Sequence, residues 1–488
     1  MRKTKAERSV ERHPNHIGIR EGAGYMAGEA GNMFALTYIS SFLKVFYTDV
    51  LRIPTQKVAR LFLFSRLWDC VNDPLWGAVV AKRKARPEGK YRPYIKQLAV
   101  PLAVSEMLCF LNIQRLTQNQ ALFLVFAYCT YILFGMLYTG VNVPFGSLAS
   151  VITDDPEGRT LLSTFRSIGT GIGAAAPLLL APMLIYSKVS DGSGGTYNVA
   201  NGSGMFWFAC IMAAFAIVFY FVGYKSTKER IRSDTHATAD MRKTYAGMLK
   251  SKPFILLALG GILISGQLQF ASLNQYLYKN YFCNTSLSAL GTIAQYLPTV
   301  IMLPLTPGLV KRFGKKELSC VGACIASVAA IAVCVLRPAP DNPALFLIMQ
   351  FLIGMGYCVV SITNWAVVAD VIDYQQVMTG ERSESAVYAV YTFCLKFGQT
   401  LADYGGLMLL GRIGYSAETM ANAGFVPGVS EGILRVCTVI PAVVYSLIFV
   451  IYALYPLNKK RLEPIYTQIR AANETAAAEP SAHGADDA

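Results

Sequence analysis

Two acidic residues four positions apart carry the most specific chemical signal in this chain. Asp69 and Asp73 lie within a largely apolar stretch, in the segment RLWDCVNDP at residues 66–74. Ionisable groups at membrane depth are costly to insert and are therefore usually functional. Helical spacings of three and four place Arg66, Asp69 and Asp73 on one stripe of a helix, with Asn72 beside them. Two carboxylates that converge on one small volume predict a site for a cation or a proton.

The elements that position these residues are predicted to be membrane-spanning helices. Of the 488 residues, 53% are hydrophobic and only 15% are charged, whereas about a quarter of an ordinary soluble domain is charged. A helix needs about 20 apolar residues to span a bilayer. Twelve stretches of this kind occur, at residues 25–50, 58–81, 94–113, 119–145, 161–186, 204–224, 253–278, 287–309, 317–336, 344–372, 384–412 and 430–456.

The distribution of Lys and Arg predicts which side of the membrane the chain ends face. An even number of spans places both termini on the same side, and most of the 44 Lys and Arg residues fall on that side, in the terminal segments and alternate loops. Basic loops are typically cytoplasmic. We therefore expect a multi-pass protein of the cell (inner) membrane with both termini in the cytoplasm. The net charge of +14 then reflects topology and not nucleic-acid binding.

The longest internal polar stretch, residues 225–252, separates six spans from six. A basic, glycine-containing turn follows the second span at 82–93 and recurs after the eighth at 311–316. Such a duplicated layout is typical of transporters whose substrate binds between two halves. The predicted organisation is a cytoplasmic segment at 1–24, a six-helix bundle at 25–224, a cytoplasmic linker at 225–252, a second six-helix bundle at 253–456 and a disordered cytoplasmic tail at 457–488.

Five segments carry recognisable motifs: RLWDCVNDPLWG at 66–77, GKYRP at 89–93, YTGVNVPF at 138–145, ADVIDY at 369–374 and RSESAVY at 382–388, the last leading to Lys396. Together they resemble the motifs of the glycoside-pentoside-hexuronide:cation symporters, a family of the major facilitator superfamily. The resemblance extends from about residue 25 to residue 404. It implies an all-α membrane protein with the major facilitator fold, 12 transmembrane helices in two six-helix bundles.

The resemblance implies that Asp69, Asn72, Asp73 and Thr139 bind the coupling cation, which is Na⁺, H⁺ or Li⁺. Asp69 and Asp73 would be the ligands of a metal cation, since hard oxygen ligands suit hard cations. No other cofactor is expected. A structural alternative is that Asp73 accepts hydrogen bonds near the helix distortion at Pro74 while Asp69 pairs with Arg66.

The resemblance also implies a substrate site that differs from that of galactoside carriers in the family. Galactoside carriers place acids on helices one and four, where this chain has Met33 and Asn142, although Glu29 lies one turn earlier. Arg166 and Lys396 match basic residues that face the central cavity, so both acidic and neutral glycosides are plausible substrates. Sugars need amide or hydroxyl partners and a flat apolar face. The predicted substrate-binding residues are Glu29, Asn32, Asn142, Arg166, Asn364, Trp365, Tyr391, Thr392 and Lys396.

Alternative interpretations of Arg166 and Trp365 are interfacial snorkelling and lipid or helix packing, respectively. Glu106 and Asp403 are interpreted as isolated acids. The four histidines fall in predicted cytoplasmic segments and no Walker-type phosphate loop occurs, so neither an intramembrane zinc enzyme nor an ATP-driven pump is expected.

We therefore expect a secondary active transporter, and not an enzyme, that couples a cation gradient to uptake of a glycoside, pentoside or hexuronide by alternating access. Its expected partners are the small-molecule glycoside and membrane lipid, and we expect it to function as a monomer. A carrier of lipid-like or other amphipathic solutes on the same fold is the main alternative, and a transport-inactive sensor is another.

Overall fold

The structure is a computed structural model that describes residues 17–82, 87–113, 119–153, 156–190, 196–230, 251–379, 384–416, 425–465 and 467–468. Most of the predicted linker, residues 231–250, lies outside the described residues, as do residues 1–16 of the predicted N-terminal segment and residues 466 and 469–488 of the predicted tail. Residues 380–383, which include the first two residues of the RSESAVY motif, also lie outside them.

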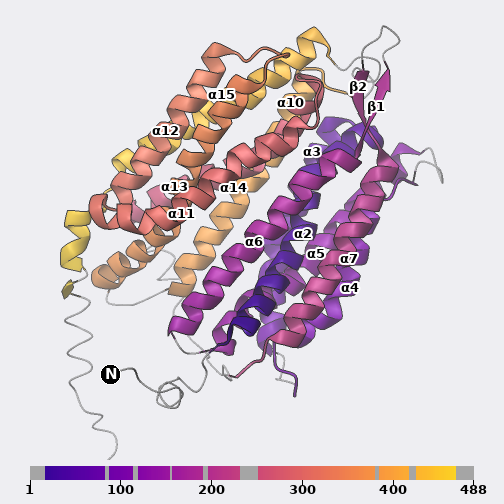
Figure 1. The fold of residues 1–488 in the computed structure, drawn as a ribbon. Coiled ribbons are helices and arrows are strands. Elements are labelled where there is room, and N and C mark those ends of the chain that lie inside the picture. The colour runs from indigo at the N-terminus through magenta and orange to yellow at the C-terminus, as the bar shows by residue number, and fades with distance from the viewer. Residues whose placement is uncertain are drawn as a thin grey trace, which may run out of the picture. The chain divides into compact units, whose positions relative to one another are not determined.

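The chain forms two compact units, and the first contains residues 1–236, 272–292 and 403–434. Helices dominate its described part in Figure 1. They are α2 (Ile19–Val45), the π-helix η1 (Phe46–Val50), α3 (Thr55–Lys82), α4 (Arg92–Cys109), α5 (Gln120–Ile152), α6 (Pro156–Leu184) and α7 (Gly202–Ser226). Asparagines begin two of them: Asn119 accepts a hydrogen bond from the backbone of Ala121, and Asn201 accepts one from Gly204. These side chains satisfy backbone donors that a helix start leaves open.

Within this unit, α2 packs against both α6 and α7. Glycines permit the close approach of α6, because a Cβ atom at Gly169 would lie 2.3 Å from the carbonyl oxygen of Met26 and one at Gly173 would lie 2.5 Å from that of Ala30. Small residues at such interfaces let helix backbones meet in a membrane, where apolar side chains alone give little driving force. This contact brings the middle of α2 next to the middle of α6.

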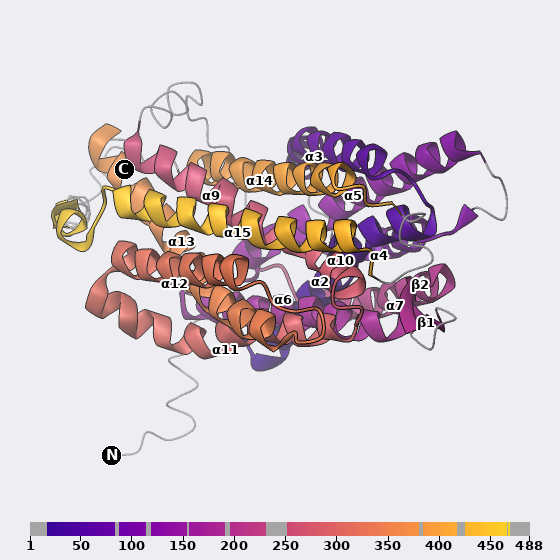
Figure 2. The ribbon, with the colours of Figure 1, turned by 90° about the horizontal axis from the view of Figure 1, so that it is seen from above.

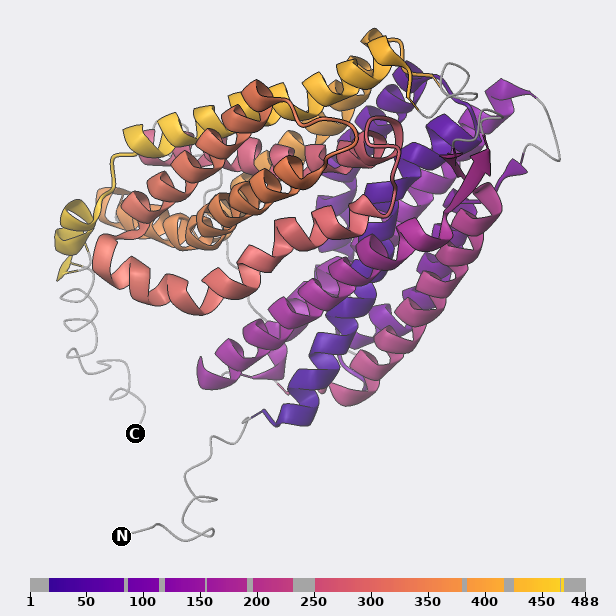
Figure 3. The same ribbon diagram turned by 45° about the horizontal axis from the view of Figure 1, so that its top comes forward.

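An antiparallel hairpin joins α6 to α7 and was not predicted from the sequence. Its strands are β1 (Tyr186–Ser190) and β2 (Thr196–Ala200), with Tyr186 opposite Ala200. The hairpin lies at one end of the helices of this unit (Figures 1 and 3). Asn198 of β2 donates a 3.1 Å hydrogen bond to the carbonyl oxygen of Cys283, which connects the hairpin to the 272–292 segment of the same unit.

A polar cluster fixes the 272–292 and 403–434 segments to the end of α2 within this unit. Asp49 of η1 forms an ion pair with Lys279 and accepts a 2.8 Å hydrogen bond from the hydroxyl of Tyr415. Thr48 lies within 3.0 Å of the hydroxyl of Tyr276. Both members of the ion pair are largely buried, so each supplies the counter-charge that the other needs in a low-dielectric surrounding.

The second unit contains residues 237–271, 293–402 and 435–488. Its helices include α9 (Lys252–Phe270), α12 (Lys315–Leu336) and α13 (Ala344–Thr379), and Figure 2 shows them from above. The two units share α11 (Leu287–Phe313), α14 (Glu384–Arg412) and α15 (Pro427–Leu454), whereas η3 (Ala271–Leu273) and α10 (Asn274–Asn280) continue from α9.

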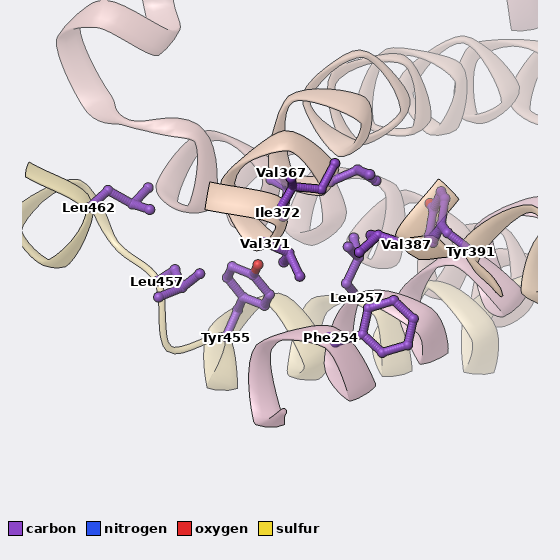
Figure 4. Packing of buried hydrophobic residues seen from close by; sticks show 11 residues of the cluster. Phe254, Leu257, Val367, Val371, Ile372, Val387, Tyr391, Tyr455, Leu457 and Leu462 are labelled. Atoms are coloured by element: carbon purple, nitrogen blue, oxygen red, sulfur yellow. The ribbon is translucent and has the colours of Figure 1, made fainter. Parts of the chain in front are cut away.

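Apolar side chains of α9, α13 and α14 form one core of the second unit. Phe254 and Leu257 of α9 pack in the same cluster as Val371 of α13 and Tyr391 of α14, all almost fully buried (Figure 4). A second cluster joins α12 to α13 through small residues, with Ala326 and Ala330 of α12 fully buried. These cores hold Asn364, Tyr391 and Lys396 on well-packed helices.

Each of the twelve predicted spans coincides with a helix or a continuous helical stretch, and the prediction of an all-α membrane protein is confirmed. Among the described residues, eight helices are long and apolar enough to cross a membrane. The remaining four are α2, α3, α4 and α14, which carry most of the charged residues discussed below, whereas Arg166 lies on α6. The count of twelve spanning helices and the six-and-six bundle boundaries stay predictions, and the compact units divide the chain at other positions.

Candidate functional site

The predicted cation-binding residues meet where α3 contacts α5. Thr139 of α5 donates a 3.0 Å hydrogen bond to Oδ1 of Asp73. One turn earlier on α5, Gly135 leaves room for the other carboxylate, because a Cβ atom there would lie 2.8 Å from Oδ1 of Asp69. The four-residue spacing of Gly135 and Thr139 thus matches that of Asp69 and Asp73. Three of the four predicted cation-site residues are therefore brought together.

Asn72 is the fourth predicted member, and its side chain is buried on the same helix. Its Nδ2 atom has no hydrogen-bond partner among the described residues. No described hydrogen bond connects Asn72 to Asp69, Asp73 or Thr139. A direct role in the site therefore stays a prediction.

The chemistry available at this contact is that of hard oxygen atoms. Asp69 and Asp73 are half-buried, and their carboxylates and the Thr139 hydroxyl are the donor set. No group of three or more His, Cys, Asp and Glu residues suited to a metal ion occurs in the described part of the chain. Two carboxylates with a hydroxyl suit a weakly held monovalent cation or a proton better than a tightly chelated divalent or transition metal.

Arg66 lies close to this carboxylate pair. Its Nη1 atom is 3.9 Å from Oδ2 of Asp69, an ion pair that spans one helical turn. This contact agrees with one half of the structural alternative for Asp69. The hydrogen bond that Asp73 receives comes from Thr139 of another helix, so Asp73 is tied to α5 as well as to its own helix.

On α2, Glu29 and Asn32 face two different sets of partners. Glu29 is buried, and its Oε2 atom is 3.4 Å from Nε of Arg166, while its Oε1 atom accepts a 3.1 Å hydrogen bond from Thr170. The α2–α6 glycine contact positions this pair. Arg166 itself is 39% exposed, so its guanidinium reaches solvent-accessible space with Glu29 as its counter-charge.

Asn32 is fully buried and uses both ends of its amide. Its Nδ2 atom donates to Oδ1 of Asn142 at 2.9 Å and to the hydroxyl of Tyr138 at 3.3 Å, and its Oδ1 atom accepts a 3.0 Å bond from Tyr220. The structure therefore joins two predicted substrate residues, Asn32 and Asn142, in one network. The described contacts of Asn32 are all internal to the bundle.

The second unit holds the other predicted substrate residues. Asn364 is buried, donates a short hydrogen bond to the hydroxyl of Tyr391 and accepts a 3.1 Å bond from Tyr452. Trp365 lies edge-to-face on Tyr391, with ring centroids 5.6 Å apart, and is 48% exposed. Thr392 is exposed and Lys396 is half-buried on α14. The Trp365 ring therefore packs against a neighbouring helix while part of it stays exposed, and its contact with a sugar stays a prediction.

The interpretation of Asp403 as isolated is wrong. Asp403 is fully buried and forms an ion pair with Lys44 of α2, and its Oδ2 atom is 3.8 Å from Nε of Arg66. Lys44 was not singled out from the sequence. A lysine within an apolar span was the available signal, since a buried lysine requires an acidic partner. Glu106, by contrast, is fully buried, and neither carboxylate oxygen has a hydrogen-bond partner among the described residues.

Comparison with known proteins decides the family. A family model described as "MFS/sugar transport protein" matches residues 24–459. The chain belongs to the MFS/sugar transport family. An uncharacterised symporter of Bacillus subtilis, YjmB, is 30% identical over 91% of this chain and 94% of its own length. The glucuronide carrier protein homolog of Escherichia coli is 28% identical over 93% of this chain and 96% of its own length.

Solved structures support the fold of this sugar-transport family member. A bacterial homolog of the human lysosomal transporter Spinster matches with a TM-score of 0.61 at 13% identity, covering 93% of this chain and 97% of that one. At this identity the likeness concerns the fold alone. The predicted major facilitator fold and family are confirmed. The prediction of a cation-coupled sugar symporter that is not an enzyme is confirmed by the family and by the relatives. A small-molecule sugar substrate and a membrane location are likewise confirmed.

Proposed function

We propose that this symporter carries a glycoside together with one monovalent cation, Na⁺ or H⁺, and that the cation binds between Asp69 and Asp73 of α3 and Thr139 of α5. The observation that carries the proposal is the hydrogen bond from Thr139 to Asp73 beside the space that Gly135 leaves for Asp69. Carboxylate and hydroxyl oxygens from two helices converge there, and a bound cation would neutralise the repulsion between the two acids.

Cation binding and sugar transport are coupled if the cation stabilises the sugar-binding form of the protein. Such linkage is reciprocal, so bound sugar strengthens cation binding by the same factor. Alternating access then moves both together across the inner cell membrane, with both chain termini in the cytoplasm and a monomer as the transporting unit. Li⁺ is a further candidate at the same oxygen ligands.

The sugar ligands come from the exposed or partly exposed residues Arg166, Trp365, Thr392 and Lys396, and Glu29 orients Arg166. The amides of Asn32, Asn142 and Asn364 and the hydroxyl of Tyr391 support the site through their internal hydrogen bonds. Arg166 and Lys396 both carry positive charge, so we expect the two together to favour an acidic sugar. The glucuronide carrier homolog of Escherichia coli supports a hexuronide as one substrate class.

Uptake into proteoliposomes tests this proposal. A panel of labelled glucuronides, glucosides, pentosides and melibiose is offered with Na⁺ and H⁺ gradients imposed separately. We expect uphill accumulation of at least one glycoside with one of the two gradients. Melibiose should be a poor substrate, because Met33 and Asn142 replace the acids of galactoside carriers and Asn142 already accepts a bond from Asn32. Accumulation of no glycoside, with uptake of lysolipids instead, would contradict the proposal.

A further inference from the structure

Lys44 and Asp403 form an ion pair to which the proposed function assigns no role. Both side chains are buried, with exposures of 1% and 0%. The Lys44 ammonium also donates a 2.6 Å hydrogen bond to Oγ of Ser272 and lies 5.7 Å from the ring centroid of Phe62. A buried ion pair adds little net stability, because desolvation offsets the attraction between the charges. Its presence in a membrane helix therefore points to a function.

Arg66 connects this pair to the proposed cation site. Its guanidinium lies 3.8 Å from Asp403 through Nε and 3.9 Å from Asp69 through Nη1. Both distances exceed that of a hydrogen bond. Two acids therefore attract the guanidinium across nearly equal distances, and a small displacement would favour one over the other. A cation bound at Asp69 would repel the Arg66 guanidinium and favour its contact with Asp403.

We propose that Asp403 and Lys44 are positioning residues that set how tightly Asp69 holds the coupling cation. A cation on Asp69 competes with Arg66 for the same carboxylate, and Asp403 receives the guanidinium when the cation binds. Lys44 limits this effect, because its ammonium already forms an ion pair with Oδ1 of Asp403, whereas Arg66 lies near Oδ2. The inference rests on the cation site proposed above.

The arrangement also links cation binding to a larger part of the first unit. Ser272 and Asp403 begin the 272–292 and 403–434 segments, which pack with α2 and α3 in that unit. Lys44 contacts both residues. Movement of Arg66 toward Asp403 would thus alter the contacts that hold these two segments. By linkage, displacement of the segments would alter cation affinity.

Cation-dependent thermal stability of the purified full-length protein tests the inference without knowledge of the sugar. The probes are Na⁺, Li⁺ and H⁺, each titrated alone, and the half-saturating concentration of the cation that stabilises the wild type is measured. Asp403→Asn should raise this concentration roughly fivefold or more, because Arg66 then pairs with Asp69. Lys44→Met should lower it, since Asp403 then draws Arg66 more strongly. Asp403→Glu should restore the wild-type value.

Each single variant leaves one buried charge without its partner and can therefore misfold. The double variant Lys44→Met/Asp403→Asn removes both charges and so provides a test that does not depend on the single variants. It should still bind the cation more weakly than the wild type, whereas a merely structural pair would give wild-type binding. The matched control is Glu21→Gln/Arg230→Met, which removes another ion pair of the same unit whose described contacts involve neither Arg66 nor the 272–292 and 403–434 segments. This control should leave the half-saturating concentration unchanged.

Two further outcomes separate this inference from the proposed function. Loss of the cation response in Asp73→Asn, together with wild-type binding in Lys44→Met/Asp403→Asn, would overturn the positioning role alone. A full cation response in Asp73→Asn, or a wild type that none of the three cations stabilises, would overturn the proposed cation site and the inference with it.

Discussion

The space around Asp69 depends on a residue that has no side chain. Gly135 of α5 lies opposite that carboxylate, and a Cβ atom there would approach Oδ1 to 2.8 Å. Real Cβ atoms do not approach so closely, so a larger residue would displace Asp69 from its position near Arg66 and Asp73. The glycine is therefore part of the geometry of the proposed cation site.

We predict that Gly135→Ala raises the half-saturating cation concentration for transport by roughly fivefold, about 1 kcal/mol. Alanine is a better helix former than glycine, so a general loss of helix stability is not expected. Gly146→Ala on the same helix is the control, because a Cβ atom there meets nothing within 4 Å. Equal cation activation curves for the two variants would show that Gly135 does not shape the site.

Lys396 provides a second test at the scale of single residues. Lys396 is, with Arg166, a positive charge that we expect to distinguish acidic from neutral sugars. Glucuronides should compete for transport better than the matching glucosides in the wild type, and Lys396→Gln should remove that difference. Competition assays with paired sugars measure it, and an unchanged preference in Lys396→Gln would assign acid selection to other residues.

The sequence predicted those parts of the site whose residues are close together on one helix. Asp69 and Asp73 were identified because helical spacing alone aligns them, and Thr139 through the family motif. The Lys44–Asp403 pair was missed because its members are far apart in the chain and no spacing rule connects them. Gly135 was missed because only the packing of α3 on α5 gives it a role.

At the scale of elements, the contact of α2 with α6 positions the Glu29–Arg166 pair. Gly169 and Gly173 lie one turn apart on α6 and touch backbone carbonyl groups of α2. Glu29 reaches Arg166 and Thr170 from the same stretch of α2. The separation of the two helices therefore determines whether this buried carboxylate keeps its partners.

Gly169→Val should push α6 away from α2 and destabilise the protein by about 1–3 kcal/mol, the usual cost of overpacking. A Cβ atom at Gly169 would lie 2.3 Å from the Met26 carbonyl oxygen, whereas one at Gly171 meets nothing within 4 Å. Gly171→Val is thus the matched control on the same helix. Thermal unfolding in detergent compares the two, and similar melting temperatures would contradict the close-packing role of Gly169.

The length of apolar runs was sufficient to predict the helices but not the irregular elements between them. The hairpin β1–β2 was absent from the prediction, because its short strands lack a long alternating pattern and lie in a polar loop. The π-helix at Phe46–Val50 and the 3₁₀ turn at Ala271–Leu273 interrupt predicted spans at points where composition does not change. Tertiary contacts of Asp49 and Ser272 accompany these irregularities.

Across the whole molecule, four helices carry charged residues within their predicted spans. The four helices that fall short of a simple apolar span are α2, α3, α4 and α14, and they hold Glu29, Lys44, Asp69, Asp73, Glu106, Lys396 and Asp403. A protein that only needed to reside in the membrane would gain nothing from the insertion cost of these residues. A symporter can use such residues, and Glu29, Asp69, Asp73 and Lys396 belong to the cation and sugar sites proposed above.

The most direct test of the central claim is transport by Asp73→Asn in proteoliposomes, with uphill accumulation and sugar exchange measured on the same preparation. The substitution removes a carboxylate from the proposed cation site and leaves the proposed sugar ligands in place. We predict loss of gradient-driven accumulation while exchange of labelled for unlabelled sugar continues. Accumulation by Asp73→Asn equal to that of the wild type, at equal amounts of reconstituted protein, would contradict the assignment of the coupling cation to Asp69 and Asp73.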